Sequence, residues 1–112
     1  MQNGIYHVTF SSSLGSGGEG LIVVSEQAIN GGDAGYVYQG RLTTDGEAVS
    51  GSLNIKRFKP GHVSVFGQAD QFVLDLAGTF NASTSTFQVT GNVHGMPQMK
   101  ISISGNKVSI LA

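Results

Sequence analysis

Three histidines, His7, His62 and His94, are the side chains of this sequence best suited to bind a metal or to transfer a proton at neutral pH. None of them has a partner at the short, same-face spacing that is typical of metal sites. His94, Met96 and Met99 offer imidazole and thioether groups of the kind that bind Cu(I). However, the residues between them predict a turn, and Met99 begins an apolar strand face. Because the sequence also has no cysteine, we predict no metal site and no cofactor.

Asp33 is the most obvious candidate for a catalytic carboxylate, with His62 as a conceivable partner. Catalysis of that kind needs a nucleophile, a base and an orienting group within mutual reach, and the sequence near Asp33 supplies none of them. We therefore interpret Asp33 as a turn residue whose carboxylate accepts backbone N–H bonds. The glycine-rich segment 15–20 lacks the Lys-Ser/Thr ending of a phosphate loop, so we interpret it as a hairpin loop. We predict that the protein is not an enzyme.

The segment around Asp33 also organises the chain. Gly31, Gly32 and Asp33 predict a tight turn, because glycine tolerates positive φ angles and aspartate favours turns. A short strand at 28–30 precedes this turn, and a longer alternating strand follows it to about Thr43.

Tyr36, Tyr38 and Leu42 share one face of that longer strand. Buried tyrosines need hydrogen-bond partners for their hydroxyl groups, and Gln39 and Arg57 are plausible ones. One interpretation is simple core packing. The other is a pocket or a protein interface formed by Tyr36, Tyr38, Leu42 and Arg57, since such residues are enriched at binding surfaces.

The bulk properties restrict the class of protein. A length of 112 residues predicts a single domain over 1–112, and a net charge of −1 with 12% charged residues argues against nucleic-acid binding. The only basic cluster, 56–59, would alternate between the two faces of a strand. The sequence has no apolar run of membrane-spanning length and no signal-peptide pattern at its start. We therefore expect a cytoplasmic protein that does not bind membranes.

Period-2 alternation of apolar residues dominates the chain and predicts strands. The 19–25 segment contains a β-branched run that predicts a strand buried on both faces, and 63–70 could be a short strand or a lid-like loop. The Asp45-Gly46 pair predicts a hairpin, and Gly105-Asn106 predicts a turn before a last short strand. The predicted strands are 4–10, 19–25, 28–30, 36–43, 49–58, 72–80, 87–93, 99–103 and 108–110.

Strands of this number, joined by hairpin-length loops, predict an all-β antiparallel meander. Gly40, Gly51, Gly78 and Gly91 lie on its apolar face, and interior glycines are typical of the sharp bends of a barrel. We therefore favour a small up-and-down β-barrel of about eight strands over a sandwich. A barrel of this size can be filled by side chains or can hold one small ligand.

Several segments together resemble the GrlR-like family of small negative regulators of type III secretion. The most specific of them is the block from Gly31-Gly32-Asp33 to Tyr38-Gln39-Gly40. The others are 3–10, 18–20, 56–58, 64–67 and 72–74. The resemblance covers nearly the whole chain and implies a lipocalin-like, eight-stranded barrel that forms a homodimer.

The resemblance also implies a function. The characterised regulator of the family binds a transcriptional activator and keeps it from its promoter, and an exposed run of four acidic residues is implicated in that contact. The corresponding residues here are 44–47, of which Asp45 and Glu47 match, whereas Thr44 and Gly46 depart from the acidic pattern.

Two functional hypotheses follow. The first is a non-enzymatic regulatory protein that sequesters another protein through Asp45 and Glu47. The alternative is a carrier or sensor that binds a small apolar ligand inside the barrel, next to Tyr36 and Tyr38; it requires a cavity there.

Overall fold

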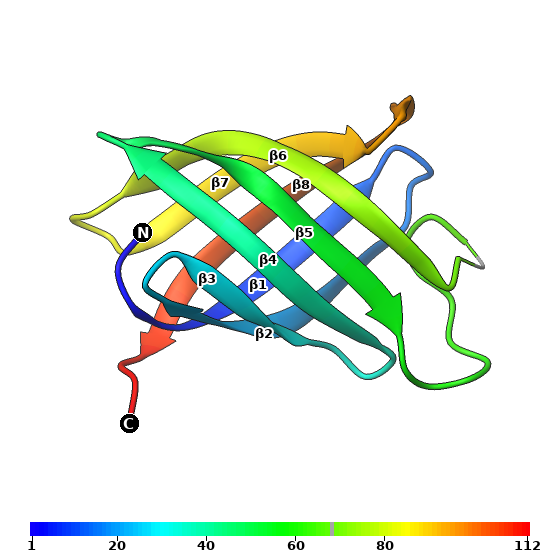
Figure 1. Cartoon of the computed structure of the whole chain (residues 1–112), viewed down its shortest axis with the longest axis horizontal. Coiled ribbons are helices and arrows are strands. Elements are labelled where there is room, and N and C mark those ends of the chain that lie inside the picture. Colours follow the sequence, from blue (N-terminus) through cyan, green and yellow to red (C-terminus); the bar gives the residue numbers. More distant parts are fainter. Residues whose placement is uncertain (68) are drawn as a thin grey trace.

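The computed structural model describes residues 1–67 and 69–112, which form one closed antiparallel β-barrel (Figure 1). Each strand pairs with its neighbours in the sequence, and β8 pairs with β1 to close the barrel. The strands are β1 (Gly4–Ser12), β2 (Gly17–Ser25), β3 (Ala28–Gly32), β4 (Tyr36–Asp45), β5 (Ala48–Arg57), β6 (Gln71–Asn81), β7 (Thr86–Val93) and β8 (Met96–Ser109). The predicted up-and-down barrel of about eight strands is confirmed, and the sandwich is not.

The alternation of apolar and polar residues explains why these segments form strands with one buried face and one exposed face. In β1, for example, Tyr6 and Val8 are buried, whereas Thr9 between Val8 and Phe10 is exposed. β2 corrects the prediction of a strand buried on both faces. Ile22 and Val24 point into the barrel, but Leu21 is 51% exposed on the outside. A β-branched run therefore does not distinguish a doubly buried strand from a half-buried one.

β8 corrects a second prediction. It runs without interruption through Gly105 and Asn106, where a turn was expected. Gly105 pairs with Phe87 of β7, and a Cβ atom at Gly105 would collide with the Phe87 ring. This glycine therefore makes room for an aromatic side chain inside the barrel and does not end the strand.

Four interior glycines allow neighbouring strands to approach one another closely. A Cβ atom on any of them would overlap a backbone carbonyl oxygen of the adjacent strand, so these positions need glycine for close packing, whereas the sequence suggested sharp bends there. They are Gly40 in β4, Gly51 in β5, Gly78 in β6 and Gly91 in β7.

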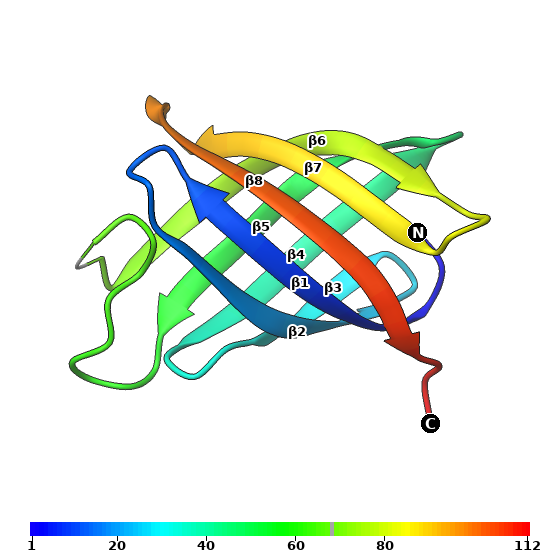
Figure 2. The ribbon, with the colours of Figure 1, turned by 180° about the vertical axis from the view of Figure 1, so that it is seen from behind.

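The barrel has two different ends, which Figures 1 and 2 show from opposite sides. We call one end the base; it carries the turns between β2 and β3, β4 and β5, and β6 and β7, as well as both chain termini. We call the other end the mouth; it carries the turns between β1 and β2, β3 and β4, and β7 and β8. The long connection between β5 and β6 is also at the mouth.

That connection consists of residues 58–70 and includes 63–70, the segment for which the sequence left a short strand and a lid-like loop open. Its described residues form no strand and contain one isolated bridge, between Ser64 and Gly67. Gln68, which belongs to the same segment, lies outside the described residues. Within the described ranges, no helix is long and apolar enough to cross a membrane.

Candidate binding sites at the two ends of the barrel

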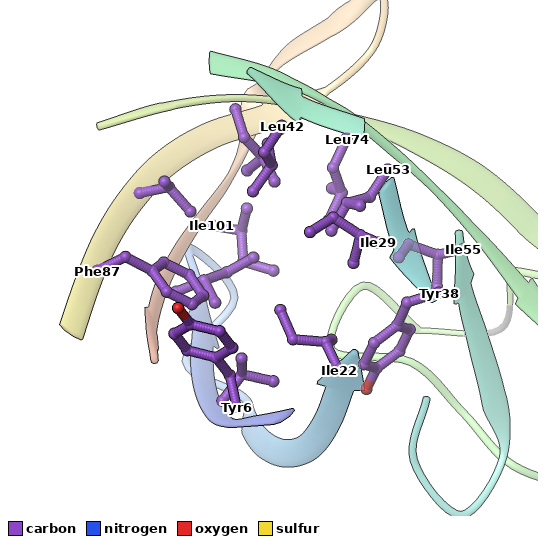
Figure 3. Packing of buried hydrophobic residues seen from close by; sticks show 14 of the residues in the cluster. Tyr6, Ile22, Ile29, Tyr38, Leu42, Leu53, Ile55, Leu74, Phe87 and Ile101 are labelled. Carbon is purple, nitrogen blue, oxygen red and sulfur yellow. The ribbon is translucent and has the colours of Figure 1, made fainter. Parts of the chain in front are cut away.

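The base of the barrel is filled by side chains. Tyr6, Val24, Ile29 and Val49 are each at most 1% exposed. The rings of Tyr6 and Phe87 meet edge to face with their centroids 5.8 Å apart, an arrangement that aromatic pairs favour. Figure 3 shows Tyr6, Ile29 and Phe87 pointing into the interior of the barrel. A ligand could not enter from this end.

The other half of the interior contains a cavity of about 280 Å³ that reaches the mouth. Its wall is formed mostly by inward-facing aliphatic and aromatic side chains of the strands, among them Ile22, Leu53, Leu76 and Val89. At the mouth the wall is completed by Asp33 and Ala34 of the β3–β4 turn and by residues 62–65 of the long connection. The interior is therefore not fully packed, as the ligand hypothesis requires.

The long connection is held over the mouth by specific contacts. Ser12 Oγ donates a hydrogen bond to the Val65 carbonyl oxygen at 2.8 Å, and the Tyr36 hydroxyl donates one to the Ala69 carbonyl oxygen at 2.8 Å. The Phe66 and Phe72 rings meet edge to face at 5.7 Å. These contacts place the connection as a cover above the cavity.

Asp33 and Tyr38 form the main polar group in the wall of the cavity. Asp33 Oδ1 accepts hydrogen bonds from the backbone N–H groups of Gly35 and Tyr36, both at 2.9 Å, and Asp33 Oδ2 accepts one from the Tyr38 hydroxyl. Burial, together with the hydrogen bond to Asp33 and its negative charge, raises the pKa of Tyr38 far above its ordinary value. The phenol therefore keeps its proton and donates a hydrogen bond to Asp33.

The residues proposed as a pocket divide into two groups. Tyr36, Tyr38 and Leu42 line the cavity, whereas Arg57 is not part of its wall. The Arg57 guanidinium instead pairs with Asp70 and donates to the His62 carbonyl oxygen at 3.2 Å. Arg57 at the end of β5 thus holds two residues of the cover, His62 and Asp70.

Gln39 and Arg57 were wrong as predicted partners of the two tyrosine hydroxyls, which bond to Ala69 and Asp33 instead. Gln39 lies on the opposite face of β4, where its amide donates to the Asn30 side chain at 3.0 Å.

The predicted turn at Gly31, Gly32 and Asp33 is shifted by two residues. Gly31 and Gly32 are the last residues of β3, and the turn begins at Asp33. Neither glycine has a positive φ angle. A Cβ atom on Gly31 would instead overlap the Leu21 carbonyl oxygen, and one on Gly32 the Tyr36 carbonyl oxygen. These positions need glycine because the neighbouring strands approach closely there.

Asp45 and Glu47 lie at the base, outside the cavity wall, on the turn between β4 and β5. Asp45 pairs with Ala48, so Gly46 and Glu47 form a two-residue hairpin loop, and Gly46 has a φ of 63°. Both acidic residues are exposed. Within the described residues, neither carboxylate forms a hydrogen bond or an ion pair.

The histidines lie apart from one another. His7 pairs with Glu19 at 3.2 Å and His94 with Asp75 at 2.7 Å, both on the outer surface. In residues 1–67 and 69–112, no three histidine, aspartate or glutamate side chains are placed to hold a metal ion. His62 lies at the mouth, against Gly35, and contributes to the cavity wall together with Val63 and Ser64. These loop residues could not be assigned to the pocket from the sequence, because no periodic pattern relates a loop to the strands that it covers.

The fold and its two ends define a small closed β-barrel with an apolar interior cavity and an exposed acidic turn. Residues 1–111 match the model of a protein family described as "T3SS negative regulator, GrlR". The chain therefore belongs to the GrlR family of negative regulators of type III secretion, as its resemblance suggested. A search of curated proteins found no match.

Proposed function

We propose that this family member is a non-enzymatic cytoplasmic regulator that binds a transcriptional activator protein and keeps it from its promoter. Family membership supports the regulatory role. The proposed contact is the acidic turn, which we define as Asp45, Gly46 and Glu47.

The observation that carries this proposal is which carboxylates contact other side chains of the barrel and which do not. The chain has seven acidic residues, and five of them contact a side chain of the barrel itself. These five contacts are Glu19–His7, Glu26–Asn3, Asp33–Tyr38, Asp70–Arg57 and Asp75–His94. In the part of the chain that the structure describes, only Asp45 and Glu47 have no such contact.

Two neighbouring carboxylates that contact no other side chain of the described barrel favour a partner that supplies lysine or arginine side chains. Charge complementarity of this kind sets the association rate and the choice of partner more than it sets the affinity. The two-residue loop holds the carboxylates on a rigid hairpin, so little conformational freedom is lost on binding. The partner surface that fits this turn is therefore basic, as expected for a DNA-binding activator.

We propose that the protein acts as a homodimer. Apolar side chains are exposed on both strands that flank β1. Leu21 of β2 and Val108 of β8 are 51% and 55% exposed, and Val23 of β2 is 37% exposed. Exposed apolar side chains grouped on neighbouring strands are typical of protein interfaces.

Asp45→Asn with Glu47→Gln is expected to weaken binding of the activator by about tenfold, which corresponds to about 1.4 kcal/mol. Both replacements keep the size of the side chain, and Gly46 keeps the turn. The partner is first captured from the host cytosol and identified by mass spectrometry. The affinity of the purified pair is then measured by calorimetry, and native mass spectrometry gives the stoichiometry of the complex.

The matched control is Glu19→Gln with Asp75→Asn, which removes two carboxylates that lie on the outer surface near the mouth. This control has the same net charge as the test variant and is expected to bind like the wild type. Equal affinities of the test variant and the wild type would remove the acidic turn from the proposal.

A further inference from the structure

We propose that the cavity is a binding site for a small apolar molecule that carries a hydroxyl or amine group at one end, with that group placed against Asp33 and Tyr38. This site lies at the mouth, at the opposite end of the barrel from the acidic turn, so the inference does not depend on the proposed protein partner.

The size of the cavity limits the size of the ligand. An apolar protein cavity of about 150 Å³ can hold benzene, and typical ligand pockets begin at about 300 Å³. The cavity here has about 280 Å³, which is room for an aliphatic or aromatic body of roughly ten non-hydrogen atoms. A long-chain lipid would not fit.

The wall of the cavity favours an apolar body. Most of the wall is formed by aliphatic and aromatic side chains such as Ile22, Leu53, Leu76 and Val89, and the lining residues come from seven of the eight strands. Water in such a space lacks hydrogen-bond partners, so an apolar molecule gains free energy by replacing it.

The polar atoms at the mouth determine the chemistry of the other end of the ligand. The Tyr38 hydroxyl uses its proton in the bond to Asp33, so its oxygen can only accept a further bond. The Asp33 carboxylate is itself an acceptor. Ser64 Oγ donates to the Gly67 carbonyl oxygen at 3.0 Å and is likewise left as an acceptor. These three acceptors favour a ligand that brings its own donor, and among the described wall residues the His62 imidazole is the side chain that can still donate to a ligand.

The negative charge of Asp33 disfavours ligands that end in a carboxylate. Asp33 carries its carboxylate into the wall, and no lysine or arginine is among the described residues that line the cavity. Besides the two tyrosines, Tyr36 and Tyr38, the other titratable residues of the wall are His62 and Glu19, and the Glu19 side chain turns outward to His7. A ligand carboxylate would face Asp33 at low dielectric without a fixed counter-charge. Fatty acids are therefore disfavoured, whereas alcohols and amines of the same length are favoured.

Three probes of equal length test this inference: n-octanol, n-octylamine and octanoate. Each is titrated into the ¹⁵N-labelled full chain and followed by amide chemical shifts. We expect octanol and octylamine to shift the resonances of cavity residues such as Ile22 and Leu76 in a saturable manner. We expect octanoate to bind at least about tenfold more weakly, the cost of a missing hydrogen bond to a charged group.

Ile22 in β2 and Val73 in β6 supply the matched variants. Ile22→Phe adds volume inside the cavity and is expected to weaken octanol binding at least about tenfold. Val73 is 37% exposed and is not part of the cavity wall, so Val73→Phe makes a larger side chain on the outer face and is expected to leave binding unchanged. If Ile22→Phe does not fold, Leu53→Phe adds volume at another wall of the same cavity.

The inference is contradicted if none of the three probes shifts the cavity resonances. It is also contradicted if octanoate binds as tightly as octanol, or if a folded variant with a filled cavity binds octanol like the wild type. Loss of activator binding in the acidic-turn variant would leave these results unaffected, so the two proposals can fail independently.

Discussion

Gly91→Ala is expected to lower the free energy of unfolding by about 3 kcal/mol, the upper part of the range for overpacked interiors. Gly91 in β7 pairs with Leu76 of β6 on one side and with Ile101 of β8 on the other. A Cβ atom there would overlap the Asp75 carbonyl oxygen and lie 2.8 Å from its carbonyl carbon. These are backbone atoms in the middle of a sheet, so relief requires β6 and β7 to separate.

Urea denaturation followed by circular dichroism measures this change. In thermal unfolding, a loss of 3 kcal/mol should lower the melting temperature of a domain of this size by roughly 13 °C. The control is Thr90→Ala, one residue earlier on the exposed face of the same strand. We expect the control to change stability by no more than about 0.5 kcal/mol. A Gly91→Ala variant as stable as the control would show that these glycines do not permit the close approach of the strands.

Asp33→Ala is expected to cost a similar amount, about 3 kcal/mol, because it leaves three donors without their acceptor. The Gly35 and Tyr36 N–H groups and the Tyr38 hydroxyl all bond to this one carboxylate. Tyr38 is only 6% exposed, so water cannot readily replace the lost bond.

Two further variants separate the contributions of the two oxygens. Asp33→Asn keeps an oxygen for the two backbone N–H groups and should recover more than half of the loss. Tyr38→Phe removes the third donor, so combining it with Asp33→Ala should cost less than the sum of the two single changes. Additive costs in urea denaturation would contradict a direct interaction between Asp33 and Tyr38.

The strands and their faces could be predicted from the sequence because apolar residues recur at every second position on the buried face of a strand. The alternation of Tyr36, Tyr38 and Leu42 placed these side chains on one face, and the structure places that face inside the barrel. Local glycine signals were less reliable. Gly105 and Gly31 were assigned to turns, but both lie in strands where close packing requires the absence of a side chain.

The cavity could be predicted only in part. Its strand residues follow from alternation, but its cover does not, because residues 62–65 reach the mouth through long-range contacts such as that between Ser12 and Val65. The bond between Asp33 and Tyr38 depends on the geometry of a turn and on the direction of β4 after it. No spacing rule for strands predicts such a contact.

The separation of the two ends has a consequence for regulation. The acidic turn lies at the packed base, and the cavity opens at the mouth. A protein partner at the base and a small molecule at the mouth would not compete for the same surface. The proposed activator contact can therefore be tested without reference to any ligand.

The most direct test of the proposed function is a transcriptional reporter for a type III secretion promoter in a host that lacks its own copy of this regulator. The wild type is expected to lower reporter output. At equal protein abundance, the variant with Asp45→Asn and Glu47→Gln should leave output near that of the empty vector. The variant with Glu19→Gln and Asp75→Asn should repress like the wild type. Full repression by the acidic-turn variant would contradict the proposed role of Asp45 and Glu47 in binding the activator.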